Sequence, residues 1–244
     1  MTSVRLCLLS LLLLASGSVA NSPPRIAIII DDLGYKLEAG RRAIRLPGPI
    51  SFAVLPGTPR ARTLAAEAHA SGKEVLLHLP LQARSDDSMQ EPLGLNLNMN
   101  RQEFGDTFEA ALISVPHVIG INSHRGSLLT RHPGHMQWLM EEILARDNLF
   151  FIDSYTTHRS VALMVAHELG VDARKRDVFL DPDRDPKTVV REFERMKSLA
   201  DKRGSVVAIG HPYAATLELL ERELPKLAEQ GYELVTISEL VSPP

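Results

Sequence analysis

Residues 26–32 read Ile-Ala-Ile-Ile-Ile-Asp-Asp, an apolar run that ends in two adjacent carboxylates. A short apolar run without alternation is typical of a strand that is buried on both faces, as in parallel sheets covered by helices. Similar runs follow along the chain, at residues 50–56, 74–81, 118–124, 149–154, 178–181, 205–212 and 233–238. We therefore interpret 26–32 as the first strand of a parallel sheet.

Amphipathic segments separate these runs. Apolar residues recur at helical spacing within residues 59–72, 104–115, 136–144, 186–204 and 214–230. The alternation of strand and helix predicts right-handed crossovers and a sheet that is either open or closed into a barrel. No change in composition divides the chain, so we expect a single α/β domain over residues 21–244. In such folds the active site lies at the carboxyl ends of the strands.

Residues 1–20 have the three parts of a secretory signal peptide. Arg5 precedes an apolar run over residues 6–15, and Ser18-Val19-Ala20 has the small-x-small pattern of a cleavage site. The run is short for a transmembrane span, and an uncleaved amphiphilic anchor is the alternative. Cleavage would leave 224 residues with a net charge of −4 and would remove Cys7. We expect an exported protein, periplasmic in a Gram-negative source, without stable membrane insertion after cleavage.

The composition excludes several classes of protein. The chain has 27 Lys and Arg against 30 Asp and Glu, and this net charge of −3 argues against a nucleic-acid binder. The apolar fraction of 44% and the charged fraction of 23% argue against disorder. A single cysteine excludes a disulfide framework and a thiolate zinc site, so oxygen and imidazole nitrogen would have to hold any metal.

Asp31 and Asp32 are the most informative polar residues at a strand end. Two adjacent carboxylates repel each other, and a cation or a shared proton would relieve the repulsion. On an extended strand the two side chains would point in different directions, which would let one bind metal while the other faces substrate. The alternative is that they cap a following helix, since Asp is a good N-cap residue.

Histidines occupy other strand ends. His78 lies in Leu-Leu-His-Leu-Pro and, taken alone, is more often a core histidine than a ligand. His124 lies in a polar loop with Asn122, Ser123 and Arg125, a context that favours function. One Asp and two His from three strand ends would form an open divalent-metal centre with a water at the remaining position.

Two further strand-end residues each have two interpretations. His211 follows an apolar run and could act as a general acid, because histidine titrates near neutral pH. Alternatively, it is a loop histidine ordered by Pro212. Asp153 could orient a ligand or a catalytic histidine, as carboxylates near metal sites do. Alternatively, it caps a helix that begins near Ser160.

Six segments together resemble the divergent polysaccharide deacetylase family, and the resemblance extends from about residue 25 to about residue 240. They read IIDDLG (29–34), ISFAVLP (50–56), LHLPL (77–81), GINSHRGS (120–127), FIDS (151–154) and AIGHPY (208–213). The resemblance implies a distorted, mostly parallel β/α barrel of about seven or eight strands. It also implies an enzyme that removes N- or O-acetyl groups from carbohydrates.

The resemblance also assigns roles to residues. Asp31 would be the catalytic base, Asp32 would bind metal with two histidines, and His211 would protonate the leaving group. Ordinary polysaccharide deacetylases take both metal histidines from one H-x-x-x-H motif. Here Gln82 stands where the second histidine would be, so His124 would have to replace it as the partner of His78.

These observations lead to an expected function. We expect an exported hydrolase that uses a divalent ion, with zinc as the leading choice, to remove acyl groups from a polysaccharide or cell-wall glycan. Asn122, Ser123, Arg125 and Asp153 would support the ligands or contact the glycan. The alternative is a glycan-binding protein of the same fold that has lost turnover. A phosphoesterase is a second alternative, but it would need more basic residues at the strand ends than Arg125.

Overall fold

The computed structural model describes residues 22–84, 91–146 and 148–241. The expected signal peptide lies outside these described residues. Within the described ranges, no helix has the length and apolarity needed to cross a membrane.

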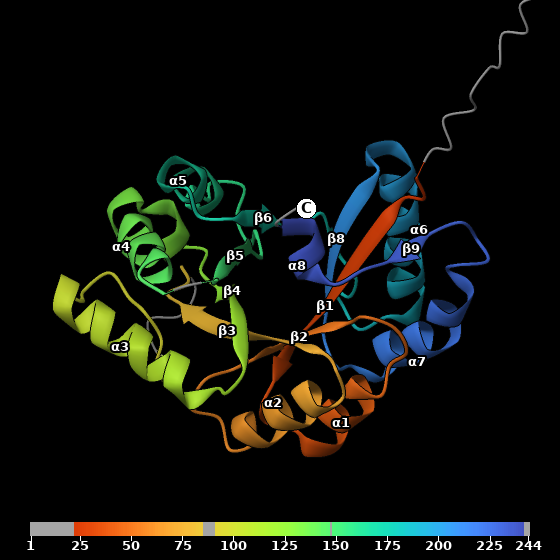
Figure 1. Cartoon of the computed structure of the whole chain (residues 1–244), viewed down its shortest axis with the longest axis horizontal. Coiled ribbons are helices and arrows are strands. Elements are labelled where there is room, and N and C mark those ends of the chain that lie inside the picture. The colour runs from red at the N-terminus through yellow and green to blue at the C-terminus, as the bar shows by residue number, and fades with distance from the viewer. Residues whose placement is uncertain (1–21, 85–90, 147, 242–244) are drawn as a thin grey trace, which may run out of the picture.

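A curved, parallel, nine-stranded sheet forms the frame of the described chain (Figure 1). Its order is β6-β5-β4-β3-β2-β1-β8-β7, and β9 pairs with β1. The strands are β1 (Arg25–Leu33), β2 (Ser51–Val54), β3 (Glu74–Leu81), β4 (Val118–Arg125), β5 (Phe150–Asp153), β6 (Ala173–Lys175), β7 (Val178–Phe179), β8 (Ser205–Gly210) and β9 (Glu233–Leu234). This arrangement confirms the prediction of a mostly parallel β/α barrel-like fold, with the first run as β1 at its centre.

Helices connect all successive strands except β6 and β7, which two residues join. These helices follow the outer side of the sheet, whereas the last short helix lies on the inner side (Figure 1). They are α1 (Leu37–Ile44), α2 (Ala61–Ala70), α3 (Arg101–Ser114), α4 (Pro133–Leu144), α5 (Ala162–Leu169), α6 (Pro186–Arg203), α7 (Ala214–Glu223) and α8 (Ile237–Val241), with single 3-10 turns η1 (Leu129–Arg131) and η2 (Leu224–Lys226). These connecting helices bury the outer face of the central strands, and the inner core with α8 buries the other face.

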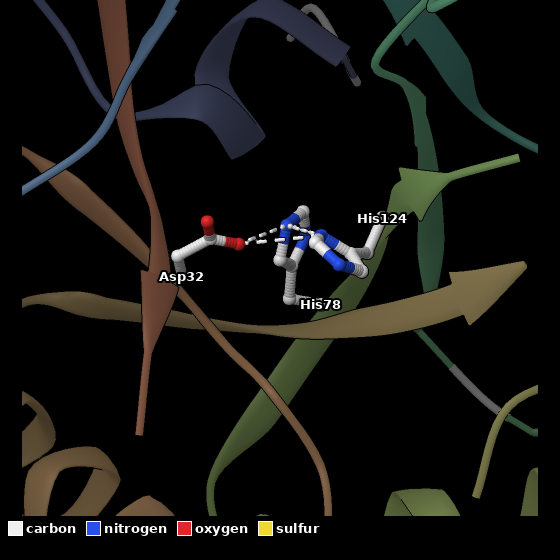
Figure 2. A group of neighbouring side chains, drawn as sticks. All are labelled: Asp32, His78 and His124. Atoms are coloured by element: carbon white, nitrogen blue, oxygen red, sulfur yellow. Dashed lines mark hydrogen bonds and ion pairs between the residues drawn. The ribbon is translucent and has the colours of Figure 1, made fainter. Parts of the chain in front are cut away.

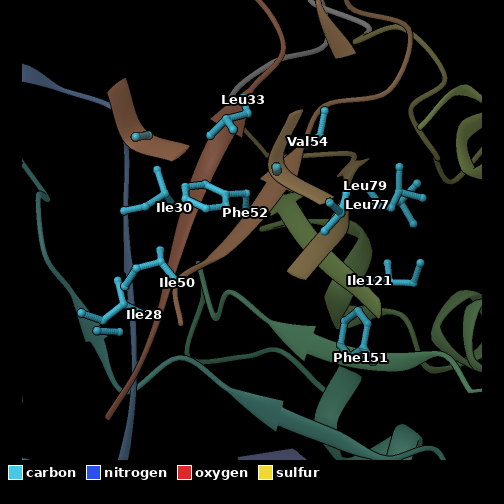
Figure 3. Close-up of a cluster of buried hydrophobic side chains, with 14 of the residues drawn as sticks. Ile28, Ile30, Leu33, Ile50, Phe52, Val54, Leu77, Leu79, Ile121 and Phe151 are labelled. Atoms are coloured by element: carbon cyan, nitrogen blue, oxygen red, sulfur yellow. The ribbon is translucent and has the colours of Figure 1, made fainter. Parts of the chain in front are cut away.

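The protein has two hydrophobic cores, one on each face of the sheet, and the side chains of each central strand point alternately into one and the other. Ile28 and Ile30 point outward with Phe52 and Phe151 into the larger core between sheet and helices (Figure 3). Ala27 and Ile29 of the same strand belong to the inner core, which α8 covers. The same strand therefore presents alternate residues to opposite faces, even though nearly all of them are apolar.

Among the described strands no ladder closes the sheet, because its order ends at β6 on one side and β7 on the other. Helix α8 lies near the gap and contacts both β1 and β6. The Arg174 guanidinium of β6 donates hydrogen bonds across the gap to the Leu240 carbonyl oxygen and to Ser205 Oγ, each at 3.0 Å. A helix and an arginine thus close the inner core where strands do not.

Several details differ from the sequence-based expectation. The run 233–238 forms a strand only at Glu233–Leu234, and helix α8 begins at Ile237. Strand β6 carries the polar sequence Ala-Arg-Lys and therefore gives no apolar signal. The helix expected over 214–230 ends at Glu223 and continues as the 3-10 turn η2, which contains Pro225. Proline has no backbone N–H to extend the helical hydrogen bonds, so it ends the regular helix.

The outer core supplies a test of the fold. Phe151 is fully buried between the sheet and the helices, so we expect Phe151→Ala to lower the free energy of unfolding by about 3–5 kcal/mol. The matched control is Ile113→Ala on α3, since Ile113 is 65% exposed and should change stability by about 0.5 kcal/mol or less. Urea denaturation followed by circular dichroism measures both. Equal midpoints for the two variants would contradict the described core.

Candidate active site at the carboxyl ends of the strands

The inner face of the sheet turns polar where its strands end. Asp31 follows Ala27 and Ile29 on the inner side of β1, and His78 follows Leu76 on β3. Asn122 lies opposite His78 in the ladder between β3 and β4. Because the strands are parallel, these carboxyl ends meet at one edge of the curved sheet.

Asp31 and Asp32 reach the same histidine. The register between β1 and β2 shifts between Ile30 and Leu33, and Asp32 has a left-handed backbone conformation with φ of 59°. This irregularity turns Asp32 inward, so that Asp32 Oδ1 lies 3.2 Å and Asp31 Oδ2 lies 3.6 Å from His78 Nε2. The expectation that the two side chains point in different directions is therefore wrong, because it assumed a regular strand.

Asp32, His78 and His124 converge from β1, β3 and β4 (Figure 2). His124 Nδ1 lies 3.2 Å from Asp32 Oδ1 and 2.9 Å from His78 Nε2. Ligand atoms about 2.0–2.2 Å from a tetrahedral zinc ion are about 3.3–3.6 Å apart, slightly more than these separations. The expected trio thus presents one oxygen and two nitrogens at nearly the spacing of a shared ion.

The protonation of His78 also suits a cation. The His78 Nδ1–H donates to Asn122 Oδ1 at 2.9 Å, which leaves the lone pair of Nε2 directed toward Asp32 and His124. Burial lowers the pKa of His78 to about 4, so the ring is neutral at pH 7. Asp32 Oδ1 is buried and has no hydrogen-bond partner within the described residues. A divalent ion would satisfy this oxygen, so these residues fit a metal.

The neighbouring carboxylates have opposite pKa shifts. Burial raises the pKa of Asp31, which is 3% exposed. Burial also acts to raise the pKa of Asp32, but the contact with His124 opposes this effect and helps to hold that pKa well below its ordinary range. Asp31 accepts a hydrogen bond of 3.1 Å from the Asn122 amide. Two adjacent carboxyl groups are thus prepared for different tasks.

His211 forms a separate pair with Asp181. His211 Nδ1–H donates to Asp181 Oδ1 at 2.9 Å, and the His211 backbone N–H donates to Oδ2 at 2.7 Å. Thr216 Oγ donates to Oδ2 as well, at 2.6 Å. Burial lowers the pKa of His211, but Asp181 and the nearby charge of Asp31 outweigh it and raise the pKa to about 9. His211 is therefore an imidazolium at pH 7, and its Nε2 lies 3.6 Å from Asp32 Oδ2.

Three other expected site residues are further from this centre. Ser123 points to the outer face, where its Oγ accepts a hydrogen bond from Ser154 N. Asp153 accepts from Tyr155 N at 2.8 Å and from Ser160 Oγ at 2.6 Å, which orders the loop before α5. Its described hydrogen bonds include no histidine, and α5 has no side-chain cap at its N-cap residue Val161, so Asp153 takes neither of the two expected roles. Arg125 lies 3.7 Å from Glu91 at the rim.

Sequence reasoning did not assign roles to three residues of the site. Ser154 Oγ donates to Asn122 Oδ1 at 2.8 Å, and Asp181 holds His211. Glu91 Oε1 lies 3.9 Å from His124 Nε2, beside the expected ligand. The signal for Asp181 was its place at the end of an apolar run, and that for Ser154 was its position two residues after Ile152 on the inner face. Glu91 comes from a loop and gave no such signal.

Comparisons with known proteins identify the family of the chain. Residues 28–241 match the family model described as divergent polysaccharide deacetylase. The uncharacterized protein YibQ of Escherichia coli (strain K12) is 37% identical over 235 residues, which cover 96% of this chain and 72% of that protein. Family membership thus rests on sequence along nearly the whole domain.

Solved structures share the fold at low sequence identity. Uncharacterized protein ATU2773 from Agrobacterium tumefaciens C58 superposes with a TM-score of 0.85 at 19% identity, over 93% of this chain and 91% of that one. The catalytic domain of a peptidoglycan N-acetylglucosamine deacetylase from Eubacterium rectale gives 0.58 at 16% identity, over 92% and 93%. A CE4 family pseudoenzyme from Bacillus anthracis, BA3943, gives 0.53 at 15% identity, over 91% and 66%. By the match of its sequence, the chain belongs to the divergent polysaccharide deacetylase family.

Proposed function

We propose that this protein is a metal-dependent hydrolase that removes acyl groups, acetyl above all, from a polysaccharide or cell-wall glycan after export to the periplasm. The observation that carries the proposal is the convergence of Asp32, His78 and His124 beside a buried Asp31 and a protonated His211. A site for a metal, a base and an acid together suits acyl hydrolysis. Zinc is the proposed ion, because imidazole nitrogens and one carboxylate are ligands that zinc accepts.

Asp32, His78 and His124 would hold the ion, which would polarise the acyl carbonyl and lower the pKa of the attacking water. Asp31 takes the proton of that water, because its carboxyl group lies beside the trio and its burial raises its pKa toward the range of a useful base. Asn122 fixes the Asp31 carboxylate through its amide N–H. In the proposed reaction, Asp31 and Asp32 would thus have different roles, although the two residues are adjacent in sequence.

His211 donates the second proton. Its Nδ1–H is engaged by Asp181, so Nε2–H is the group that faces the site, near Asp32. The departing amine or alcohol takes this proton as the bond to the acyl carbon breaks. Asp181 keeps the ring protonated and oriented, as a carboxylate behind a catalytic histidine does.

Aromatic side chains at the same edge support a sugar as the substrate. Tyr213 stacks on His211 with ring centroids 5.2 Å apart, and Tyr35 and Tyr155 follow β1 and β5. Aromatic residues make up only 5% of the chain, yet three of its four tyrosines follow strand carboxyl ends. Sugar rings pack on such aromatic faces through their apolar C–H groups.

The metal ligands can be tested by binding alone. We expect His124→Gln to lose the stoichiometric zinc that the unchanged protein retains after dialysis, because one of three ligands is removed. The control is His158→Gln, which replaces an exposed histidine outside the trio. Mass spectrometry of the metal content measures both. Equal zinc in the two variants would exclude the proposed centre.

The base can be distinguished from the ligands. Asp31→Asn keeps the shape of the side chain and leaves the trio intact, so we expect it to retain zinc and to lose acetate release by about 10²- to 10⁴-fold. The assay uses N-acetylated chitooligosaccharides or peptidoglycan fragments. An unchanged rate of acetate release would contradict the proposed hydrolase and favour a glycan-binding protein without turnover. Loss of zinc would instead make Asp31 a ligand.

The Asp181–His211 pair predicts a pH dependence. Asp181 helps to raise the pKa of His211 to about 9, so the acid form is present below that pH and is lost above it. Asp181→Asn removes the negative charge, which lowers the pKa of His211 and should move the alkaline limb of the kcat/KM profile to lower pH. Asp183→Asn, at an exposed loop carboxylate, is the control. An alkaline limb that stays in place would contradict the role of His211 as the acid.

A further inference from the structure

A basic cleft lies beside the candidate active site. It has a volume of about 450 Å³ and lies between the ends of β5, β6 and β7 and the helix α6. Its charged lining residues comprise four cations and two acids, which are Lys175, Arg176, Arg195, Arg203, Asp177 and Glu192. The cleft therefore has an excess of positive charge, although the whole chain has a net charge of −3.

The excess comes from Lys175 and Arg176. Arg203 pairs with Asp177 at 2.8 Å, and Arg195 pairs with Glu192 at 3.0 Å. Lys175 and Arg176, by contrast, form no ion pair with an acid in the part of the chain that the structure describes. The Lys175 ammonium instead lies 4.6 Å from the centroid of the Tyr155 ring.

Arg176 is built into the wall of the cleft. Its guanidinium donates to the carbonyl oxygens of Ser154 and Tyr155 at 2.7 and 3.2 Å, and its carbon lies 4.9 Å from the centroid of the Phe179 ring. Burial lowers the pKa of Arg176 even though Asp31 and Asp153 oppose the shift. A cation that is partly removed from water and has no paired carboxylate gains from a bound anion.

The cleft and the candidate site share a wall. Phe179 lines the cleft, and its ring contacts the His211 ring edge to face with centroids 5.4 Å apart. Tyr155, the aromatic residue at the end of β5, lines the cleft as well. A glycan whose acyl group lies at His211 would therefore lie next to this wall of the cleft.

We propose that this cleft binds a carboxylate on the substrate, so that the enzyme acts on an acidic acylated glycan rather than on a neutral one. The proposal rests on the proposed function and names the substrate class of that site. Lys175 and Arg176 supply the charge, and Tyr155 and Phe179 supply a surface for a sugar ring. A neutral glycan would leave both cations without an anion.

The test compares three disaccharides by titration calorimetry with the zinc-loaded protein. They are N-acetylglucosaminyl-N-acetylmuramic acid, its methyl ester and N,N′-diacetylchitobiose, of which only the first carries a carboxylate. We expect the acid to bind about tenfold more tightly than the other two, which corresponds to about 1.4 kcal/mol, since a charge-assisted hydrogen bond forms only with the acid. Its affinity should fall with added NaCl, whereas that of the neutral sugars should not.

Lys175→Gln is the diagnostic variant, because Lys175 is exposed at the end of β6 and its removal leaves the strand pairing intact. We expect it to weaken binding of the acid about fivefold and to leave the neutral sugars unchanged. Lys226→Gln, the same charge change in the distant turn η2, should alter none of the three.

Each outcome decides the proposal. Equal affinities for the acid and its ester, no binding of the acid at millimolar concentration, or equal effects of the two lysine variants would overturn it. Acetate release is measured in parallel and tests the hydrolase separately. If the protein prefers the acid but releases no acetate, the proposed role of the cleft stands and the proposed hydrolysis is wrong. If the protein hydrolyses all three disaccharides and binds them equally well, the proposed hydrolysis stands and the proposed role of the cleft is wrong.

Discussion

The side chain of Asn122 makes the contacts on which the candidate site depends. Its amide N–H binds Asp31, and its oxygen accepts hydrogen bonds from His78 and Ser154. Because an amide oxygen cannot donate, the proton of His78 must lie on Nδ1, and the lone pair of Nε2 faces Asp32 and His124. One fully buried amide thus sets both the tautomer of a ligand and the position of the base. Buried polar networks of this kind are rigid when every member is satisfied.

The alternation of side chains along parallel strands explains which residues meet Asn122. Ala27 and Ile29 on β1, and Val207 and Ile209 on β8, line the inner core, and two residues further along each strand lie Asp31 and His211. The same alternation sends Ser123 to the outer face, which separates it from its neighbour Asn122. Asp32 escapes the rule only because its backbone is left-handed, with φ of 59°, a conformation that Asp tolerates better than most residues.

Much of this was predictable from the sequence. Apolar runs revealed the parallel strands, and strand ends pointed to Asp31, His78, His124 and His211. A stricter use of the two-residue period would also have placed Ser154 inside and Asp153 outside. The bulge at Asp32 could not be predicted, because it depends on the register between β1 and β2. The position of Glu91 beside His124 could not be predicted either, because a loop has no regular repeat from which the direction of a side chain could be inferred.

The pKa values explain why so many ionisable groups can share this edge of the sheet. Burial alone would neutralise every one of them, yet the site contains partners that oppose burial at Asp32 and His211 and none strong enough at Asp31 and His78. The outcome is two carboxyl groups and two imidazoles whose pKa values lie far apart within each pair. Such a division costs folding free energy, because it leaves Asp32 Oδ1 buried without a hydrogen bond. Proteins keep ionisable groups with such strongly shifted pKa values chiefly where a ligand or a reaction requires them. This is the physical reason to look for a bound ion and a proton transfer at this site.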